Sequence, residues 1–259
     1  MKVAILYICT GKYNQFFKGF YESGEKYFLK GIAEVEYFVF TDDFSISDSP
    51  RVHFFERRCQ GFPMDSLLRF DMFLSIKEQL KSYDYVFFFN ANMLFVAPVG
   101  REFLPETEGL MAVTHPGFYN SCVPRKPYER NKKSTAYIPR VSGKSYVYYM
   151  GSLNGGRTAD FMQLAETCSR NTHADLDNGI VATVHDESHL NKYMSEHKCL
   201  ALSPAYAYPE GWKLPFTPKI MIRDKVKIDP YFNKGRDYSF FGQIKKACRI
   251  LRYMVKWYL

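Results

Sequence analysis

The sequence lacks three features that would place it in a membrane, outside the cell or around a zinc ion. No run of about 18 or more apolar residues occurs, so no transmembrane helix is predicted. The first residues, MKVAILYICTGKYN, are too strand-like and their apolar stretch too short for a signal peptide. The six cysteines contain no Cys-x-x-Cys pair, which argues against a zinc motif or a small disulfide scaffold. We therefore expect a cytoplasmic protein with reduced thiols, either soluble or peripheral on the inner membrane surface.

The common phosphate-binding loops are also absent. Neither Gly-x-Gly-x-x-Gly nor Gly-x-x-x-x-Gly-Lys-Ser/Thr occurs. Gly11-Lys12-Tyr13 follows the first apolar run, where a nucleotide would approach, but it lacks that spacing. A second glycine cluster, within residues 151–156, stands beside aromatic residues and is typical of a turn.

The pair His185 and His189 lacks the context of a metal site. Spaced i and i+4, the two imidazoles would share one face of a helix. A zincin needs His-Glu-x-x-His, whereas Glu187 stands elsewhere, and the Pro-Cys-x-x-Cys of zinc deaminases is missing. By spacing alone, HDESHLNKY (185–193) is equally consistent with a polar helix start and with a functional segment. No metal ligand is predicted.

Charge is distributed unevenly along the chain. The formal net charge is +8, and residues 245–256 supply five positive charges without any acid. The remainder is nearly balanced, so no nucleic-acid partner is predicted. The tail GQIKKACRILRYMVKWYL places apolar residues at helical spacing between the basic ones. We expect a basic amphipathic helix over 239–259 that favours an anionic membrane surface over docking on the rest of the protein.

The periodicity predicts an α/β fold with a mixed, mostly parallel sheet flanked by helices. Four apolar runs read as buried strands, and helical spacing lies between some of them, at 16–29 and 65–80. Beyond residue 100 we expect shorter aromatic strands, a helix capped by Thr158 that ends near Arg170, a short second helix, and another helix starting near His185. The four runs are VAILYI (3–8), YFVFT (37–41), VHFFE (52–56) and YVFFF (85–89).

Two asparagines follow the last of these strands. Asn90 and Asn92 are spaced i and i+2, so their side chains are expected to point together beyond the carboxyl end of the strand. Open α/β sheets bind ligands at that edge. Neutral amides are poor ligands for a hard cation, but their N–H groups suit ribose or phosphate oxygens.

Several other segments resemble those of one enzyme family. They are HPGFYN (115–120), STAYIP (134–139), YYMGSLNGG (148–156), DNGIVATVHDESHLNKY (177–193) and LSPAYAY (202–208). In order and spacing the chain resembles glycosyltransferase family 6, the histo-blood-group A and B transferases and α-1,3-galactosyltransferases. Asn-x-Asn in place of Asp-x-Asp is similar to the bacterial, metal-independent branch of that family.

The resemblance implies a GT-A type fold and a retaining hexosyl transfer. The donor would be UDP-GalNAc or UDP-galactose, and the acceptor the galactose of a fucosylated Fucα1,2Gal oligosaccharide. The catalytic domain would cover 1–238, with a nucleotide-binding half at 1–100 and an acceptor and catalytic half at 101–238. No cofactor or divalent metal is expected.

The same resemblance implies roles for individual residues. Glu187 matches the catalytic glutamate beneath the anomeric carbon of the donor, and Asp186 matches the residue that holds donor-sugar hydroxyls. On the donor side it also implies Ile8, Thr10, Tyr13, Arg69, Asn90, Asn92, Met150, Ser152, Lys234 and Arg236. On the acceptor side it implies His115, Val184 and Glu210.

Some choices stay open at this stage. GalNAc is the predicted donor sugar, because Ser152 is small enough to leave room near the acetamido group, although Met150 argues for galactose. Glu187 would form a covalent adduct or stabilise a same-face displacement. Val184 replaces an acceptor-stacking tryptophan of the blood-group enzymes, so acceptor recognition is expected to differ. A non-catalytic carbohydrate- or nucleotide-sugar-binding module is the alternative of another class.

Overall fold

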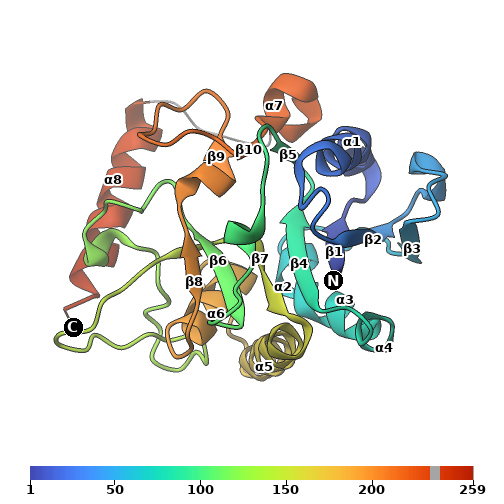
Figure 1. Ribbon diagram of the computed structural model, residues 1–259. Helices are drawn as coiled ribbons and strands as arrows, with labels where there is room; N and C mark the ends of the chain where they lie inside the picture. Colours follow the sequence, from blue (N-terminus) through green and yellow to red (C-terminus); the bar gives the residue numbers. More distant parts are fainter. Residues whose placement is uncertain (234–239, 259) are drawn as a thin grey trace.

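The computed structural model describes residues 1–233 and 240–258 (Figure 1). Its large sheet has seven strands in the order β3-β2-β1-β4-β7-β6-β8. Within it, β7 is antiparallel to its two neighbours and the other pairs are parallel, as expected for a mixed, mostly parallel sheet. The bounds are β1 Lys2–Ile8, β2 Glu34–Thr41, β3 Val52–Glu56, β4 Tyr85–Asn90, β6 Leu110–Thr114, β7 Tyr149–Arg157 and β8 Leu200–Leu202.

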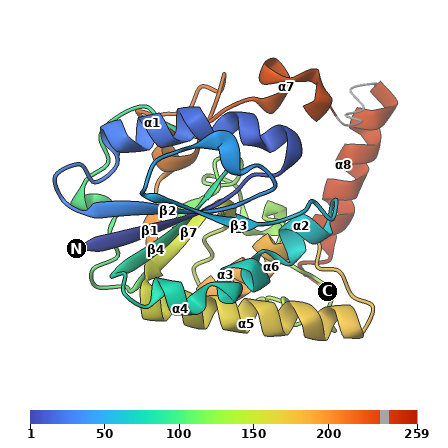
Figure 2. The same ribbon diagram turned by 90° about the vertical axis from the view of Figure 1, so that its right-hand side faces the viewer.

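Helices cover both faces of this sheet (Figure 2). A small second sheet has the order β5-β10-β9. The helices are α1 Phe17–Tyr27, α2 Met64–Leu67, α3 Arg69–Ser75, α4 Lys77–Leu80, α5 Thr158–Asp177, α6 His185–Met194, α7 Lys225–Ile228 and α8 Phe240–Val255. The small strands are β5 Met93–Phe95, β9 Tyr208–Pro209 and β10 Ile220–Ile222.

The buried strands divide their side chains between two hydrophobic cores. On β4, Phe87 and Phe89 pack into the core beneath α1, whereas Phe88 packs into the core beneath α3 and α5. Alternation along a strand produces this division, because successive side chains point to opposite faces. All four strands predicted from apolar runs are confirmed.

Three local predictions differ from the structure. The helical spacing at 65–80 is interrupted at Leu68 and Ile76, which divides it into α2, α3 and α4. The helix expected to end near Arg170 is the 20-residue α5, which continues to Asp177, so no separate second helix follows. Thr158 is its first residue rather than its cap, because its hydroxyl donates to the Tyr83 carbonyl at 2.5 Å.

The glycine cluster also differs from the prediction, because it lies within β7 rather than in a turn. A β-carbon on Gly155 would lie 2.4 Å from the Val86 carbonyl oxygen, and one on Gly156 would lie 2.2 Å from the Gly109 carbonyl oxygen. These glycines therefore allow β7 to pass close to both neighbouring strands.

The C-terminal helix docks on the rest of the protein through one face. Trp257, just after α8, is buried, with its ring 5.2 Å from Tyr146 and 4.1 Å from the guanidinium of Arg130. The sequence favoured membrane contact over docking, so docking of this face is a correction. Leu251 and Val255 on α8 remain exposed. Within the described part of the chain, no helix is long and apolar enough to cross a bilayer.

Candidate active site

Strand ends from both halves of the chain meet at one edge of the large sheet. Ile8 of β1 lies opposite Asn90 of β4 in the parallel register. Since β7 is antiparallel to β4 and β6, its first residues lie just beyond the carboxyl end of β4 and pair with the last residues of β6. His115 follows the last residue of β6. Several predicted donor and acceptor residues therefore share the edge where open α/β sheets bind ligands.

Glu187 stands in the first turn of α6 with both carboxylate oxygens hydrogen-bonded. The Tyr148 hydroxyl donates to Oε1 and the Gly151 N–H donates to Oε2, each at 2.6 Å. Burial raises the pKa of Glu187 to about 7; the bonds from Tyr148 and Gly151 oppose this rise, and the charge of Asp186 adds to it. Two donors therefore orient this carboxyl group, and its pKa lies near neutral pH.

Asp186 and Arg69 form a buried ion pair beside Glu187. Arg69 Nη1 lies 2.9 Å from Asp186 Oδ2 and donates to the Gly151 carbonyl at 2.8 Å. The guanidinium also lies 4.3 Å from the centre of the Phe88 ring. Burial raises the pKa of Asp186, and the charge of Arg69 opposes that rise. Arg69 was expected to contact the donor; in the structure its guanidinium pairs with the Asp186 carboxylate.

Two residues that the sequence did not single out hold this arrangement together. Tyr148 orients Glu187, as described above. Asn191 lies one turn further along α6, and its Oδ1 accepts a hydrogen bond from the Tyr149 N–H at 2.8 Å. Its amide donates to the Tyr149 carbonyl at 2.8 Å and to the Glu187 carbonyl at 2.9 Å. The sequence offered one signal for Asn191: it is an amide residue four positions, or one helical turn, after the candidate catalytic acid Glu187.

Asn90 and Asn92 lie together, as their spacing predicts, but Asn92 faces inward. Asn90 Nδ2 donates to Asn92 Oδ1 at 3.0 Å, and Asn92 Nδ2 donates to the Arg223 carbonyl at 2.7 Å. Asn92 is buried, whereas Asn90 is only partly covered. Asn92 therefore ties the Arg223 segment to the sheet, instead of pointing freely beyond the strand with Asn90.

The predicted uridine side carries a lysine from a distant segment. Thr10 and Tyr13 follow β1, with Tyr13 in a 3-10 turn. Lys225, the first residue of α7, donates to the Tyr13 hydroxyl at 2.9 Å, and its ammonium lies 4.9 Å from the ring centre. The structure thus places the positive charge of Lys225 beside Tyr13. The predicted diphosphate ligands Lys234 and Arg236 lie outside the described residues.

Met150 and Ser152, the pair predicted to select the donor sugar, stand on either side of Gly151, whose backbone lies close to Glu187 and Asp186. A β-carbon on Gly151, between Met150 and Ser152, would lie 3.2 Å from the Glu187 β-carbon and 3.4 Å from Asp186 Oδ2. Ser152 is buried, and its hydroxyl has no hydrogen-bond partner within the described residues. Ser152 directly follows Gly151, and an unpaired buried hydroxyl is suited to meet a polar group of a ligand.

His115 is a neutral hydrogen-bond donor. Burial lowers its pKa to about 4, so the imidazole is uncharged at neutral pH. Nδ1 accepts the Gly117 N–H at 3.0 Å, which leaves the proton of the neutral ring on Nε2. The ring lies 5.8 Å from Tyr148, the partner of Glu187. His115 is therefore linked by packing to the carboxylate.

The other predicted acceptor residues are engaged within the protein. Val184 is partly buried, and its N–H donates to the Ser188 hydroxyl at 2.9 Å. Glu210 accepts the Asp224 N–H at 2.7 Å and lies 3.4 Å from Lys227 Nζ. The bond from Asp224 lowers the pKa of Glu210. Glu210 thus stabilises the turn before α7.

The two histidines of the HDESHLNKY segment have different surroundings and do not form a pair. His185 adopts φ 50° and its ring lies 4.7 Å from the Phe62 ring. His189 is buried, with Nε2 3.9 Å from Asp175 Oδ2. Within the described residues, no group of three or more His, Cys, Asp or Glu side chains is arranged to hold a metal.

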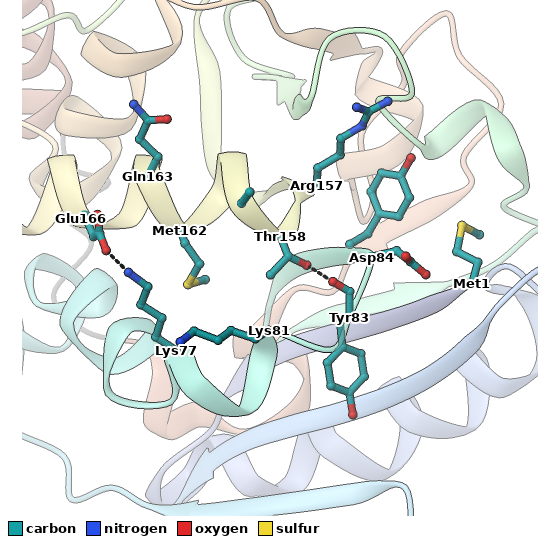
Figure 3. A pocket seen from close by; sticks show the side chains of 12 residues that line it. Met1, Lys77, Lys81, Tyr83, Asp84, Arg157, Thr158, Met162, Gln163 and Glu166 are labelled. Atoms are coloured by element: carbon teal, nitrogen blue, oxygen red, sulfur yellow. Dashed lines mark hydrogen bonds and ion pairs between the residues drawn. The ribbon is translucent and has the colours of Figure 1, made fainter.

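A groove of about 1160 Å³ lies at the opposite edge of the sheet (Figure 3). It runs between α4 and α5 beside Met1 and Asp84. Lys77 and Glu166 form an ion pair across it. The groove contains none of the convergent hydrogen bonds found around Glu187, so its size does not identify it as the active site.

The acidic pair of α6, at the carboxyl edge of a mixed α/β sheet, fits the GT-A class of glycosyltransferases. The family model described as "Glycosyltransferase family 6" matches residues 1–228. The chain therefore belongs to glycosyltransferase family 6 and is a hexosyltransferase that uses a nucleotide-sugar donor and an oligosaccharide acceptor.

Named relatives come from bacteria and vertebrates. The chain is 38% identical to "O-antigen biosynthesis glycosyltransferase WbnI" of Escherichia coli, over 95% of this chain and 100% of that protein. It is 37% identical to "Histo-blood group ABO system transferase 1" of Rattus norvegicus, over 78% of this chain and 60% of that protein. It is 31% identical to "Globoside alpha-1,3-N-acetylgalactosaminyltransferase 1" of Gallus gallus, over 92% and 70%.

Proposed function

We propose that this chain transfers GalNAc from UDP-GalNAc to the galactose of a Fucα1,2Gal oligosaccharide, forming an α-1,3 linkage with retention. The observation that supports this most is the Glu187 carboxylate, held by Tyr148 and Gly151 beside the Arg69–Asp186 ion pair. A module that only binds sugars has no need of an oriented, buried carboxyl group whose pKa lies near neutral pH. The charge is useful in a transition state.

The proposed reaction separates positive charge on the sugar from negative charge on the departing UDP. As the bond from the anomeric carbon to the diphosphate breaks, the sugar gains positive charge and UDP leaves with the electron pair. The ionised Glu187 stabilises the sugar cation or bonds to it, and Asp186 holds the sugar hydroxyls. The acceptor hydroxyl forms the new bond and passes its proton to the departing phosphate oxygen. His115 donates from Nε2 to an acceptor oxygen.

The choice of GalNAc rests on the surroundings of Ser152. Its small, buried side chain leaves room near the acetamido group, and its hydroxyl lacks a partner within the described residues. The name of the chicken relative states GalNAc transfer. Met150 favours the alternative donor, UDP-galactose. Direct competition between the two donors decides the choice, and a preference for UDP-galactose would overturn it.

We also propose that transfer needs no divalent metal. The position that holds Asp-x-Asp in metal-dependent relatives carries two neutral amides here. Asn92 Oδ1 already accepts a hydrogen bond from Asn90, and Asn92 is buried. These residues do not fit a hard cation, which favours several charged oxygens. Positive charge for the leaving UDP would come from the basic C-terminal segment, with Lys234 and Arg236 as the proposed residues and Lys225 close to Tyr13.

We further propose a cytoplasmic protein that rests on the inner membrane surface through α8. The docked face of the helix includes Tyr253, whose ring lies 4.9 Å from the guanidinium of Arg130. The opposite side leaves Leu251 and Val255 exposed among basic residues. Apolar side chains flanked by positive charge are typical of contact with anionic lipid.

The function is tested by measuring UDP release with a panel of donors and acceptors. Wild-type protein should release UDP from UDP-GalNAc when a Fucα1,2Gal acceptor is present. Glu187→Gln should lower turnover by about 10²-fold or more while calorimetry shows nearly unchanged UDP affinity. Binding of donor and acceptor without turnover in the wild type would favour the non-catalytic module.

The same assay, run in EDTA, tests the metal proposal. The rate should be unchanged in EDTA and should not rise with Mn²⁺. Asn90→Asp with Asn92→Asp should lower the rate in EDTA, because two carboxylates without a cation repel the diphosphate. Loss of wild-type activity in EDTA that Mn²⁺ restores would show that the enzyme depends on a metal.

A further inference from the structure

One exposed tryptophan lies beside the acceptor-side histidine. Trp212 leaves 50% of its surface exposed, although exposed indoles are uncommon and often mark binding surfaces. A β-carbon on Gly117 would lie 4.0 Å from Trp212 Cη2 and 3.3 Å from His115 Cε1. The indole edge and the imidazole therefore flank the same glycine, which has no side chain to separate them.

The neighbouring residues show that two segments run side by side here. Tyr119 and Phe216 form an edge-to-face pair with ring centres 5.2 Å apart. Tyr119 lies two residues after Gly117 on the first segment, and Phe216 lies four residues after Trp212 on the second segment. Residues 115–119 and 212–216 thus form one wall. His115 connects this wall to Glu187, because its ring packs on Tyr148.

The backbone around Trp212 is fixed while its side chain is left outside. The Tyr208 hydroxyl donates to the Trp212 carbonyl at 3.0 Å and accepts the Leu214 N–H at 2.8 Å. The Trp212 N–H donates to the Pro209 carbonyl at 3.2 Å. These bonds order the backbone before any ligand arrives, so a ligand that meets the indole finds a largely prepared surface.

The chemistry of the wall points to a neutral sugar. An aromatic ring packs well on the C–H face of a pyranose, while a neutral imidazole N–H bonds one of its hydroxyls. Val184, the other predicted acceptor residue near Glu187, is aliphatic and partly buried, and Glu210 is tied to Asp224 and Lys227. Neither provides a flat surface for a sugar ring.

We propose that Trp212 is the stacking platform for the acceptor oligosaccharide, with His115 as the polar contact beside it. This inference rests on the proposed function, because it assigns a residue to the acceptor of that reaction. The indole face covers one face of a pyranose ring and helps to orient the attacking hydroxyl toward the donor beside Glu187. The ring contributes to acceptor affinity and little to donor affinity.

The chain offers a direct optical test, because it has only two tryptophans. Trp257→Phe leaves Trp212 as the single indole and keeps an aromatic ring in the docking contact of α8. Titration of this variant, saturated with UDP, with a Fucα1,2Gal oligosaccharide should change the indole fluorescence in a saturable way. A spectrum that stays constant while calorimetry detects acceptor binding would overturn the proposal.

Kinetics provide the second measurement. Trp212→Ala should raise KM for the acceptor by about tenfold or more, whereas Trp212→Phe should recover most of the affinity. UDP affinity, measured by calorimetry, should be the same in both variants, which also shows that they are folded. An unchanged acceptor KM in Trp212→Ala would refute the platform while the reaction itself stands. Absence of transfer in the wild type, by contrast, would refute the proposed function.

Discussion

At residue 187 the proposed chemistry requires a carboxylate that is both shielded and ionised. Shielding favours the neutral acid, and the negative charge of Asp186 acts in the same direction. The donors from Tyr148 and Gly151 favour the ionised form, because a hydrogen bond to a charged group contributes about 1.5–3 kcal/mol. The balance leaves the pKa of Glu187 at about 7, so small changes in its surroundings should alter the active fraction.

This balance predicts the pH dependence of the reaction. Below about pH 7 Glu187 is mostly protonated and has no charge to stabilise the sugar cation, so kcat/KM should rise with pH and level off above its pKa of about 7. Tyr148→Phe removes a donor that lowers this pKa. The rising limb should therefore shift to higher pH, and kcat/KM at pH 7 should fall about tenfold.

Tyr128 provides a matched control for that experiment. Its hydroxyl is buried without a hydrogen-bond partner within the described residues, and its ring lies 5.2 Å from Tyr148. Tyr128→Phe should leave the pH profile in place. If Tyr148→Phe also leaves the limb in place, or if both variants shift it equally, the hydrogen bond to Glu187 does not set the pKa.

At the scale of elements, β7 places the site because it passes very close to β4 and β6. The added β-carbon on Gly155 would lie 2.4 Å from Phe87 Cδ1, in addition to the contact with Val86. No rearrangement of one flexible side chain relieves a contact with backbone atoms. The start of β7, which carries Gly151 toward Glu187, therefore depends on two residues that have no side chain.

Gly155→Ala should destabilise the fold without touching the site chemistry. The free energy of unfolding should fall by about 1–3 kcal/mol, the usual range for overpacking, as measured by chemical denaturation. Gly19→Ala in α1 is the control, because its added methyl would meet its nearest atoms at an ordinary 3.7 Å. Alanine favours a helix by about 1 kcal/mol over glycine, so this variant should be neutral or more stable. Equal losses in the two variants would contradict the account of β7.

The sequence predicted these elements unequally, for physical reasons. The first four strands are apolar runs whose burial is visible locally, and they were placed correctly. A strand with paired glycines has no such pattern, because the reason for its glycines lies in β4 and β6. At the candidate site, the HDESHLNKY motif predicted roles for Asp186 and Glu187 by resemblance. Tyr148 and Asn191 were missed because their partners lie 39 and 42 residues away in the chain.

At the scale of the whole molecule, the basic helix lies at one end of the large sheet. Figure 1 shows α8 on the side of β8 and β9, away from β2 and β3 at the other end of the sheet. Five of the eight net positive charges come from residues 245–256, a stretch without acids. Phe118, in the wall formed by residues 115–119 and 212–216, packs against the cluster that contains Trp257. If this side faces an anionic membrane, that wall would lie near the surface, and an acceptor anchored in lipid would reach it by diffusion along the membrane.

Vesicle sedimentation tests this orientation, and the exposed residues of α8 supply the variant. The full chain should pellet with phosphatidylglycerol vesicles but not with phosphatidylcholine vesicles, and about 0.5 M salt should release it, because each basic residue near an anionic surface contributes about 1 kcal/mol that salt screens. Leu251 is 64% exposed, so Leu251→Glu should leave the fold intact and lower vesicle affinity about tenfold by removing an inserted apolar side chain.

Phe44, 53% exposed and located between β2 and β3, is the matched control, since Phe44→Glu adds the same charge away from α8. If Leu251→Glu binds as tightly as the wild type, or if the full chain pellets with neither lipid, α8 is only a docked helix.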